Sequence, residues 1–278
     1  GVDAAPAALI GAALLDLHIE SGSKEALAAV PVLTAFVALW LFAFYVMRAG
    51  KLVNYISAPV MGGFITGICT TIILMQVPKL LGGTAGTGEF FELVEHIAET
   101  VGEINLPSLA LGVAALVIVL TAKKVIPKFP MAVLLMAAGA LMTKYLPLCA
   151  WGIKTLDAVE PGLPVWSLPD FTAVPVREAV TISLSVAVVI MAETLLAENN
   201  FAQKNGYRIN DNQEILAFAM GNLPAALTGC CPINGSVSRT AMGEQYQAKT
   251  QLTGIVAGLS MIVLLLGGTG FIGYLPVP

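Results

Sequence analysis

The sequence predicts an all-α membrane protein, and three observations lead to that prediction. Hydrophobic residues make up 57% of its 278 residues and charged residues 12%, whereas an ordinary soluble domain has about 25% charged residues. The mean hydropathy of +0.83 leaves too few polar side chains to cover a soluble globule. Apolar stretches also alternate with short polar segments, and at about 20 residues per crossing the chain accommodates about eight or nine helices.

Six stretches are long enough, or nearly so, to cross a hydrocarbon layer of ~30 Å at about 1.5 Å per residue. In chain order they are Ala26 to Met47, Ala58 to Leu81, Leu106 to Ala122 (marginal), Phe129 to Leu148, Val176 to Ala197 and Leu252 to Tyr274. Three further segments fit a crossing poorly. Ala4 to Leu17 is too short and predicts a half-span, Glu214 to Thr228 is moderately apolar, and Gly235 to Gln245 is polar.

The basic residues predict the orientation of these segments. Four loops are rich in Lys and Arg, and their basic residues are Arg48, Lys51, Lys123, Lys124, Lys128, Lys204, Arg208 and Lys249. These loops fall on one side of the membrane if every segment, including the anomalous ones, crosses it alone or together with another segment. That side is expected to be cytoplasmic. The loop from Gly82 to Asn105 carries five glutamates and neither Lys nor Arg, which predicts an external amphipathic helix.

Composition and spacing exclude several classes of protein. The net charge of -4 provides no basic field for nucleic acid. No nucleophile stands with a base, no His pair occurs, and no metal-ligand spacing is present, so the sequence predicts neither an enzyme nor a bound cofactor. The four cysteines, Cys69, Cys149, Cys230 and Cys231, lack a C-x-x-C spacing, and we expect buried, apolar side chains rather than metal or redox chemistry.

Small and ring-constrained residues supply further expectations. Gly63 with Gly67, and Gly254 with Gly258, form G-x-x-x-G pairs that predict close helix packing. Four prolines between Trp151 and Pro175 exclude regular helix there. Because the first residue is Gly rather than Met, we expect a fragment or a processed product.

One carboxylate lies within a predicted span, where an ionisable group costs several kcal/mol by most estimates. Glu193, followed by Thr194, stands more than ten residues beyond Val176 in the stretch that ends at Ala197. Burial would favour its protonated form and make it a proton carrier. The alternative is a carboxylate near the inner interface that reaches water or bonds Thr194 and a neighbouring helix.

A second unusual segment is Cys-Cys-Pro-Ile-Asn-Gly-Ser-Val-Ser-Arg-Thr, residues 230–240. Pro232 ends any preceding helix, Asn234-Gly235 predicts a tight turn, and Ser236 can cap a helix that runs through Arg239. Its free N–H groups, its dipole and Arg239 would together form an anion site, as in discontinuous transporter helices. A capped surface helix with a solvated Arg239 is the alternative.

The start of the chain predicts another short helix. Asp3 resembles an N-cap and Pro6 suits a first turn, with small side chains at the tip.

Three stretches resemble the SulP family of anion transporters, the sulfate permease family. They are Leu-Val-Asn-Tyr-Ile-Ser-Ala-Pro-Val-Met-Gly-Gly-Phe-Ile-Thr-Gly at 52–67, Gln-Val-Pro-Lys-Leu-Leu-Gly at 76–82, and Asn-Asp-Asn-Gln-Glu at 210–214 continuing through Asn222 and 235–240 to Lys-Thr-Gln at 249–251. The last stretch is the most specific. The resemblance covers essentially the whole chain.

The resemblance implies a fold of fourteen segments in two inverted seven-segment repeats, as in uracil transporters, divided into core and gate domains. A cytoplasmic STAS domain follows the last segment in that plan. Residues 1–278 would then be one incomplete transmembrane domain of about nine segments, with the first two, the last three and the STAS domain absent. Homodimers in a cell membrane, here the bacterial inner membrane, are what the family resemblance implies.

The resemblance also implies functional residues. Asp3 to Leu17 and Ser236 to Gln245 match two half-helices that hold the anion between their N-termini, so the implied substrate-binding residues are Ala4, Ala5, Ser236, Val237, Ser238 and Arg239. Glu193 matches an acidic position implicated in cation coupling, with Thr194 beside it. The family usually has Gly-Pro where this chain has Gly1-Val2. Asp3 would therefore point away as a cap, be protonated, or pair with Arg239.

These features predict secondary active transport of an inorganic anion, sulfate first, with H⁺ or Na⁺ carried at Glu193 while core and gate rock past each other. The first alternative is transport of bicarbonate or another monoanion. The second, from a different class, is a non-transporting membrane module with a structural or sensing role. The sequence leaves open the anion, the coupling ion and its stoichiometry, symport or exchange, and the oligomeric state.

Overall fold

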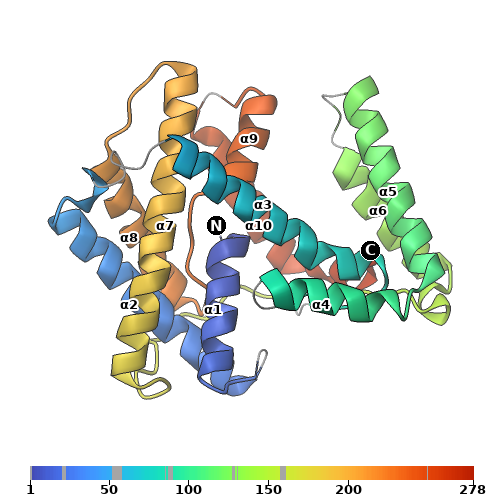
Figure 1. Ribbon diagram of the computed structural model, residues 1–278, viewed down its shortest axis with the longest axis horizontal. Helices are drawn as coiled ribbons and strands as arrows, with labels where there is room; N and C mark the ends of the chain where they lie inside the picture. Colours follow the sequence, from blue (N-terminus) through green and yellow to red (C-terminus); the bar gives the residue numbers. More distant parts are fainter. Residues whose placement is uncertain are drawn as a thin grey trace. The chain divides into compact units, whose positions relative to one another are not determined.

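The computed structural model describes residues 2–20, 23–51, 58–84, 86, 90–126, 129, 131–156, 161–248 and 250–278. Within these ranges the regular secondary structure is helical, apart from one isolated bridge between Thr155 and Pro276, and loops join the helices. The α-helices, drawn in Figure 1, are α1 (Ala4–Asp16), α2 (Lys24–Val46), α3 (Ala58–Leu80), α4 (Phe90–Val101), α5 (Leu106–Val125), α6 (Met131–Tyr145), α7 (Val176–Asn205), α8 (Asp211–Leu227), α9 (Val237–Gln245) and α10 (Leu252–Val263). Three short helices are η2 (Leu148–Trp151), η3 (Leu264–Gly268) and η4 (Thr269–Tyr274).

Side-chain caps and glycine fix several helix ends. The side chains of Ser23 and Asn105 accept hydrogen bonds from backbone N–H groups three residues ahead, at 3.0 and 2.8 Å. Asn210 caps α8 in the same way, at 3.4 Å. Such caps satisfy N–H groups that a helix start leaves without intrahelical partners. Helix α7 ends at Gly206, whose φ of +75° suits glycine.

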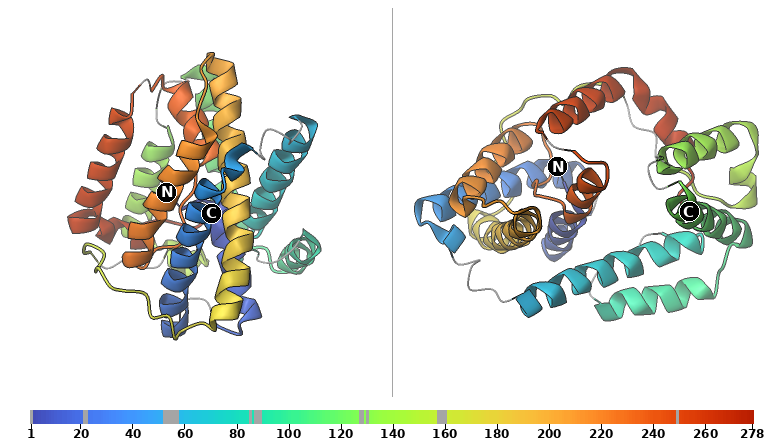
Figure 2. Two further views of the ribbon diagram at one scale, coloured as in Figure 1. Left: turned by 90° about the vertical axis from the view of Figure 1, so that its left-hand side faces the viewer. Right: turned by 90° about the horizontal axis from the view of Figure 1, so that it is seen from above.

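The chain divides into two compact units. Unit 1 comprises Gly1–Ile68 and Pro164–Gln245, and unit 2 comprises Cys69–Leu163 and Tyr246–Pro278. Helices α1, α2, α7, α8 and α9 lie in unit 1, where α2 packs against both α7 and α8 (Figure 2). The hydrophobic core of unit 1 joins residues far apart in the sequence, among them Ile10, Leu33, Val37, Ile190 and Ile215, all almost fully buried.

Unit 2 holds α4, α5, α6, α10 and the C-terminal part of α3, and its apolar side chains are mostly exposed. Leu116 and Val117 of α5 and Ile255 and Leu259 of α10 are each more than half exposed. An apolar surface of this extent is typical of helices that face lipid or another protein. The pattern agrees with the membrane environment that the composition predicts.

The predicted spans are largely confirmed as helices. Four described helical segments are long and apolar enough to cross a membrane: Lys24–Val46, Leu106–Val125, Val176–Asn205 and Leu252–Tyr274. The marginal third stretch gains length because Lys123 and Lys124 continue α5 to Val125. Helix α6, in contrast, has 15 residues and is shorter than predicted, because Pro147 ends the regular helix.

Two packing predictions are wrong. A Cβ atom added at Gly63, Gly67, Gly254 or Gly258 would meet no atom within 4 Å among the described residues, so neither G-x-x-x-G pair packs against another helix in the described part of the chain. The cysteines are free, and Cys69, Cys149 and Cys230 are exposed rather than buried. Spacing within one helix cannot tell which face its neighbours cover.

Candidate functional site

Two helix starts that are distant in the sequence meet in unit 1. Helix α1 begins at Ala4 and helix α9 begins at Val237. The guanidinium group of Arg239, in the first turn of α9, donates a hydrogen bond of 3.1 Å to the carbonyl oxygen of Val2, just ahead of α1. The two predicted half-helices are therefore linked at their N-terminal ends.

Ser236 caps α9, as the sequence predicts. Its hydroxyl oxygen accepts a hydrogen bond from the backbone N–H of Arg239 at 3.4 Å, and its carbonyl oxygen accepts one from Thr240 at 3.0 Å. Ser236 itself is buried. The positive end of a helix dipole, with N–H groups in its first turn, is suited to an anion.

Glu193 lies on α7, only 6% exposed, and contacts the segment that leads into α9. The side-chain amide of Asn234, which is also buried, donates a hydrogen bond of 3.0 Å to a carboxylate oxygen of Glu193. The pattern of residues around Glu193 gave no indication of this partner, because Asn234 belongs to a different segment 41 residues away. Glu193 is therefore buried rather than in contact with water, and its bond to a neighbouring segment is compatible with both interpretations given above.

Thr194 contacts the next residue along the same segment. Its hydroxyl oxygen accepts a hydrogen bond of 3.1 Å from the backbone N–H of Gly235. A Cβ added at Gly235 would lie 2.8 Å from the Thr194 methyl carbon. Gly235 is therefore required by this close approach. No turn forms at Asn234-Gly235, contrary to the sequence prediction, because the backbone there is held by α7 rather than by local bonds.

The remaining predicted site residues lie at the same two helix starts. Ala5 and Val237 are half-buried in the first turns of α1 and α9, and Asp3 precedes α1 with its carbonyl oxygen accepting a bond from Ala7. The side chains of Ala4 and Ser238 lie outside the described part of the structure. All substrate-binding and coupling positions expected from the sequence thus fall in unit 1.

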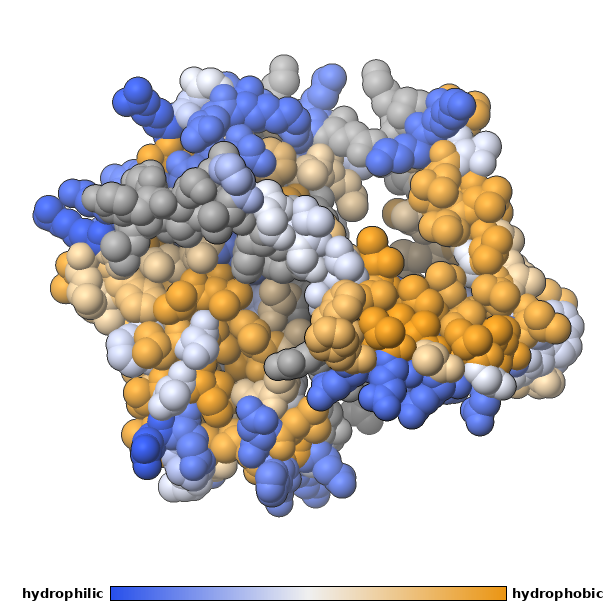
Figure 3. Space-filling view, viewed as in Figure 1, coloured by the Kyte–Doolittle hydropathy of each residue, from blue (hydrophilic) through white to orange (hydrophobic). Residues whose placement is uncertain are grey.

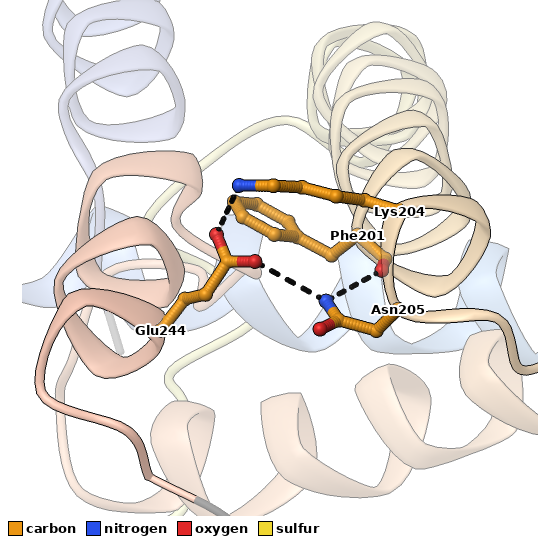
Figure 4. A network of polar contacts seen from close by, with 4 residues as sticks. All are labelled: Phe201, Lys204, Asn205 and Glu244. Atoms are coloured by element: carbon orange, nitrogen blue, oxygen red, sulfur yellow. Dashed lines mark hydrogen bonds and ion pairs between the residues drawn. The ribbon is translucent and has the colours of Figure 1, made fainter.

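The far end of α9 is also tied to α7. The Lys204 ammonium lies 2.7 Å from one carboxylate oxygen of Glu244, and the Asn205 amide donates to the other at 3.3 Å (Figure 4). Asn205 also bonds the carbonyl oxygen of Phe201. Helix α7 therefore holds α9 at both ends, through Glu193 and Thr194 at one end and through Lys204 and Asn205 at the other.

The chemistry available at this site is that of ion binding. It combines a helix N-terminus, a guanidinium group and a buried carboxylate with an amide and a hydroxyl beside it. Among the described residues, no group of three or more His, Cys, Asp or Glu side chains is arranged to hold a metal ion.

The chain is similar to known proteins over most of its length. A model of the sulfate permease family matches residues 3–278. A probable sulfate transporter of Mycobacterium tuberculosis is 26% identical over 230 residues, which are 83% of this chain and 41% of that protein. The sodium-independent sulfate anion transporter of Bos taurus is 27% identical, over 83% of this chain and 44% of its own length. The chain therefore spans less than half the length of these two relatives.

Solved structures show the same fold. The murine Solute Carrier 26 family member A9 anion transporter, in its inward-facing state, matches 100% of this chain and 49% of its own with a TM-score of 0.85 at 18% identity. The transmembrane domain of the cyanobacterial bicarbonate transporter BicA matches 98% of this chain and 69% of its own, with a TM-score of 0.77 at 20% identity. The predicted fold class, an all-helical membrane protein with part of the inverted-repeat architecture, is confirmed.

Proposed function

The chain belongs to the sulfate permease family, a family of transporters rather than enzymes, and from this premise we propose that it is part of a secondary active transporter of inorganic anions, with sulfate as the substrate. The hydrogen bond between Arg239 and Val2 supports the proposal most directly, because it brings a positive charge to the place where two helices begin. An anion bound there would be held by backbone N–H groups of α1 and α9 together with the guanidinium group.

The membrane potential opposes sulfate uptake unless the charge that enters is compensated, and the proposal includes co-transport of cations. Moving one negative charge inward against an inside-negative potential costs about 2.3 kcal/mol per 100 mV, and a dianion costs roughly twice that. Entry of H⁺ or Na⁺ offsets the charge. Glu193 is the residue proposed to carry the cation, either by protonation or by ligating Na⁺ with Thr194, because it is buried and is bonded to the segment that begins α9.

The two units of the chain are proposed to be parts of the core and gate domains. Unit 1 contains α1, α9, Glu193 and Thr194, so the entire candidate site belongs to one compact body, as a core domain requires. Unit 2, with its exposed apolar helices, is the proposed gate part. Movement of one body past the other would give alternating access.

Bicarbonate is the second candidate substrate, favoured by the similarity of the fold to BicA. Backbone dipoles at helix tips recognise charge more than shape, so the site geometry is compatible with either anion. A non-transporting membrane module is the alternative from another class. Further parts of the proposal are a homodimer and residence in a bacterial inner membrane.

Uptake of radiolabelled sulfate into liposomes by the full-length protein that contains this chain tests the proposal, with bicarbonate as competitor. Replacing Arg239 by Gln should lower uptake by roughly 10- to 100-fold, the effect of losing a hydrogen bond to a charged group. Arg208→Gln is the control, because Arg208 is exposed and lies outside the site. Equal uptake by both variants would contradict the assigned role of Arg239. Absence of any anion flux in the wild type would favour the non-transporting module.

A further inference from the structure

The segment Cys230–Ser236 connects α8 to α9 without regular secondary structure, although Pro232, Asn234 and Ser236 are buried. Buried backbone groups require hydrogen-bond partners, and a segment outside a helix must find them on other elements. At Cys230 and Ile233, which precede the contacts with α7, the structure shows which elements supply the hydrogen-bond partners.

Asn222 of α8 holds Ile233. Its side-chain oxygen accepts a hydrogen bond of 2.8 Å from the Ile233 N–H, and its side-chain nitrogen donates one of 3.0 Å to the Ile233 carbonyl oxygen. The same nitrogen donates to the carbonyl oxygen of Phe218 at 2.8 Å. Asn222 is 0% exposed. One amide therefore pairs, through its acceptor oxygen and its donor nitrogen, with both backbone groups of a single residue.

Thr34 of α2 holds Cys230. Its hydroxyl lies 2.9 Å from the Cys230 carbonyl oxygen and 2.9 Å from the Val30 carbonyl oxygen one turn earlier in α2. Thr34 is 0% exposed, in the middle of the hydrophobic core of unit 1. The contact joins positions 196 residues apart. A buried Thr could satisfy its hydroxyl on its own helix alone, so the second acceptor ties the connecting segment to α2.

We propose that Asn222 and Thr34 are positioning residues that set where α9 begins, and thereby the position of the anion-binding N–H groups. This inference rests on the proposed function. The segment is held at Cys230 by α2, at Ile233 by α8, and at Asn234 and Gly235 by α7. Three helices of one compact unit therefore fix the position of a helix start that the local cap at Ser236 defines only in the sequence.

The physical consequence is a dependence of anion affinity on groups that do not touch the anion. Removing the Asn222 amide takes these partners from the part-buried N–H and C=O of Ile233, and the segment is expected to shift to replace them. A shift at Ile233 moves Ser236 and the first turn of α9. Because hydrogen bonds weaken steeply with misalignment, the apparent KM for the anion should rise about three- to tenfold with a smaller change in kcat.

The thiol of Cys231 gives a readout that does not depend on transport. It lies within the connecting segment and is half-buried. In the full-length protein with the other three cysteines of this chain, and any further ones, replaced by Ser, the rate of maleimide labelling at Cys231 should rise several-fold in Asn222→Ala and in Thr34→Val. Thr34→Ser, which keeps the hydroxyl, should restore the slow rate.

The matched control is Thr181→Val, because the hydroxyl of Thr181 bonds the carbonyl oxygen of Arg177 on its own helix. If Asn222→Ala does not fold, Thr34→Val decides, since Val has the shape of Thr. Unchanged labelling and unchanged KM in the folded variants would overturn the inference. Faster labelling in a protein without anion flux would support the positioning role and contradict the proposed function instead.

Discussion

At the scale of single residues, the contact between Gly235 and Thr194 is the tightest constraint in the candidate site. A methyl group at position 235 would lie 2.8 Å from the Thr194 methyl carbon, closer than two carbon atoms pack. Both residues belong to the same small region as Glu193 and the start of α9. A side chain on Gly235 must therefore displace either the segment or α7.

Gly235→Ala is expected to destabilise the protein by about 1–3 kcal/mol, the usual cost of overpacking. Thermal unfolding of the detergent-solubilised protein measures the effect. Thr194→Ser removes the obstructing methyl group and keeps the hydroxyl, so the double variant should regain much of the loss. Gly258→Ala is the control, because its Cβ would meet no described atom. Equal unfolding temperatures for Gly235→Ala and wild type would refute the assigned close approach.

Asp170, in the segment before α7, provides a pH-dependent contact. The Thr172 hydroxyl donates to its carboxylate at 2.6 Å and the Thr172 N–H at 3.0 Å, and these bonds lower the pKa of Asp170. A carboxyl group with a lowered pKa in the folded state contributes stability above its unfolded pKa, and that contribution is lost as the pH falls through the folded value.

The difference in unfolding temperature between wild type and Asp170→Asn should therefore be present at neutral pH, begin to decrease near about pH 4 and vanish only below the lowered pKa of the folded state. The difference should be small because Asp170 is exposed. Asp170 also precedes Phe171, whose ring lies edge-on to Phe36 of α2 at 6.1 Å. A difference in unfolding temperature that does not change with pH would show that the charge of the Asp170 carboxylate has no part in the contact with Thr172.

At the scale of elements, periodicity and capping residues predicted where most helices lie, but they did not predict how helices contact one another. The ends of α8 and α9 follow local chemistry at Asn210 and Ser236 and were predicted within a few residues. The bonds from Asn222 and Thr34 join segments that only the folded chain brings together. Neither residue has a local pattern that distinguishes it from other buried polar side chains.

Helix α4 illustrates an element whose role the sequence does predict. Its glutamates Glu92, Glu95 and Glu99 share one face, and Figure 3 shows hydrophilic side chains along one edge of this helix below an apolar surface. Phe90, on the opposite face at about 100° per residue, is 49% exposed. The turn ahead of α5 is tied to the end of α3 by the hydrogen bond from Asn105 to Leu81, which keeps α4 near the ends of both helices.

We expect α4 to lie in the membrane interface with Phe90 in the acyl region and its glutamates in water. Spin labels at Phe90→Cys and at Glu95→Cys, in separate proteins without other cysteines, test this. The label at position 90 should be more accessible to oxygen, and the label at 95 to a water-soluble nickel reagent. Similar accessibilities at both positions would contradict an interfacial helix and would indicate a protein partner or full exposure to water.

At the scale of the whole molecule, the composition predicted the membrane environment and the three quoted stretches predicted the family. The all-α membrane class followed from the hydropathy pattern of the entire chain, and the inverted-repeat fold followed from the family resemblance. The direct bond from Asn234 to Glu193 could not be predicted, since it depends on the placement of two segments within unit 1. It connects the proposed coupling residue to the proposed anion site in one compact unit.

That connection predicts how anion accumulation depends on the membrane potential. For an uncoupled dianion, about 2.3 kcal/mol per charge at 100 mV, taken with 1.36 kcal/mol per tenfold change, limits the inside concentration to roughly 2,000-fold below the outside one. One accompanying cation reduces the deficit to roughly 50-fold, and two cations abolish it, provided that no cation gradient is applied.

Sulfate accumulation in liposomes at a series of potassium-diffusion potentials therefore measures the number of coupled cations. In wild type the slope of the logarithm of sulfate accumulation against membrane potential should correspond to at least one cation per sulfate. In Glu193→Gln, whose side chain can still accept a bond from Asn234, the slope should correspond to one cation fewer. Glu178→Gln is the matched control, because Glu178 is exposed on the same helix. If Glu193→Gln transports sulfate with the slope of the wild type, another residue carries the cation.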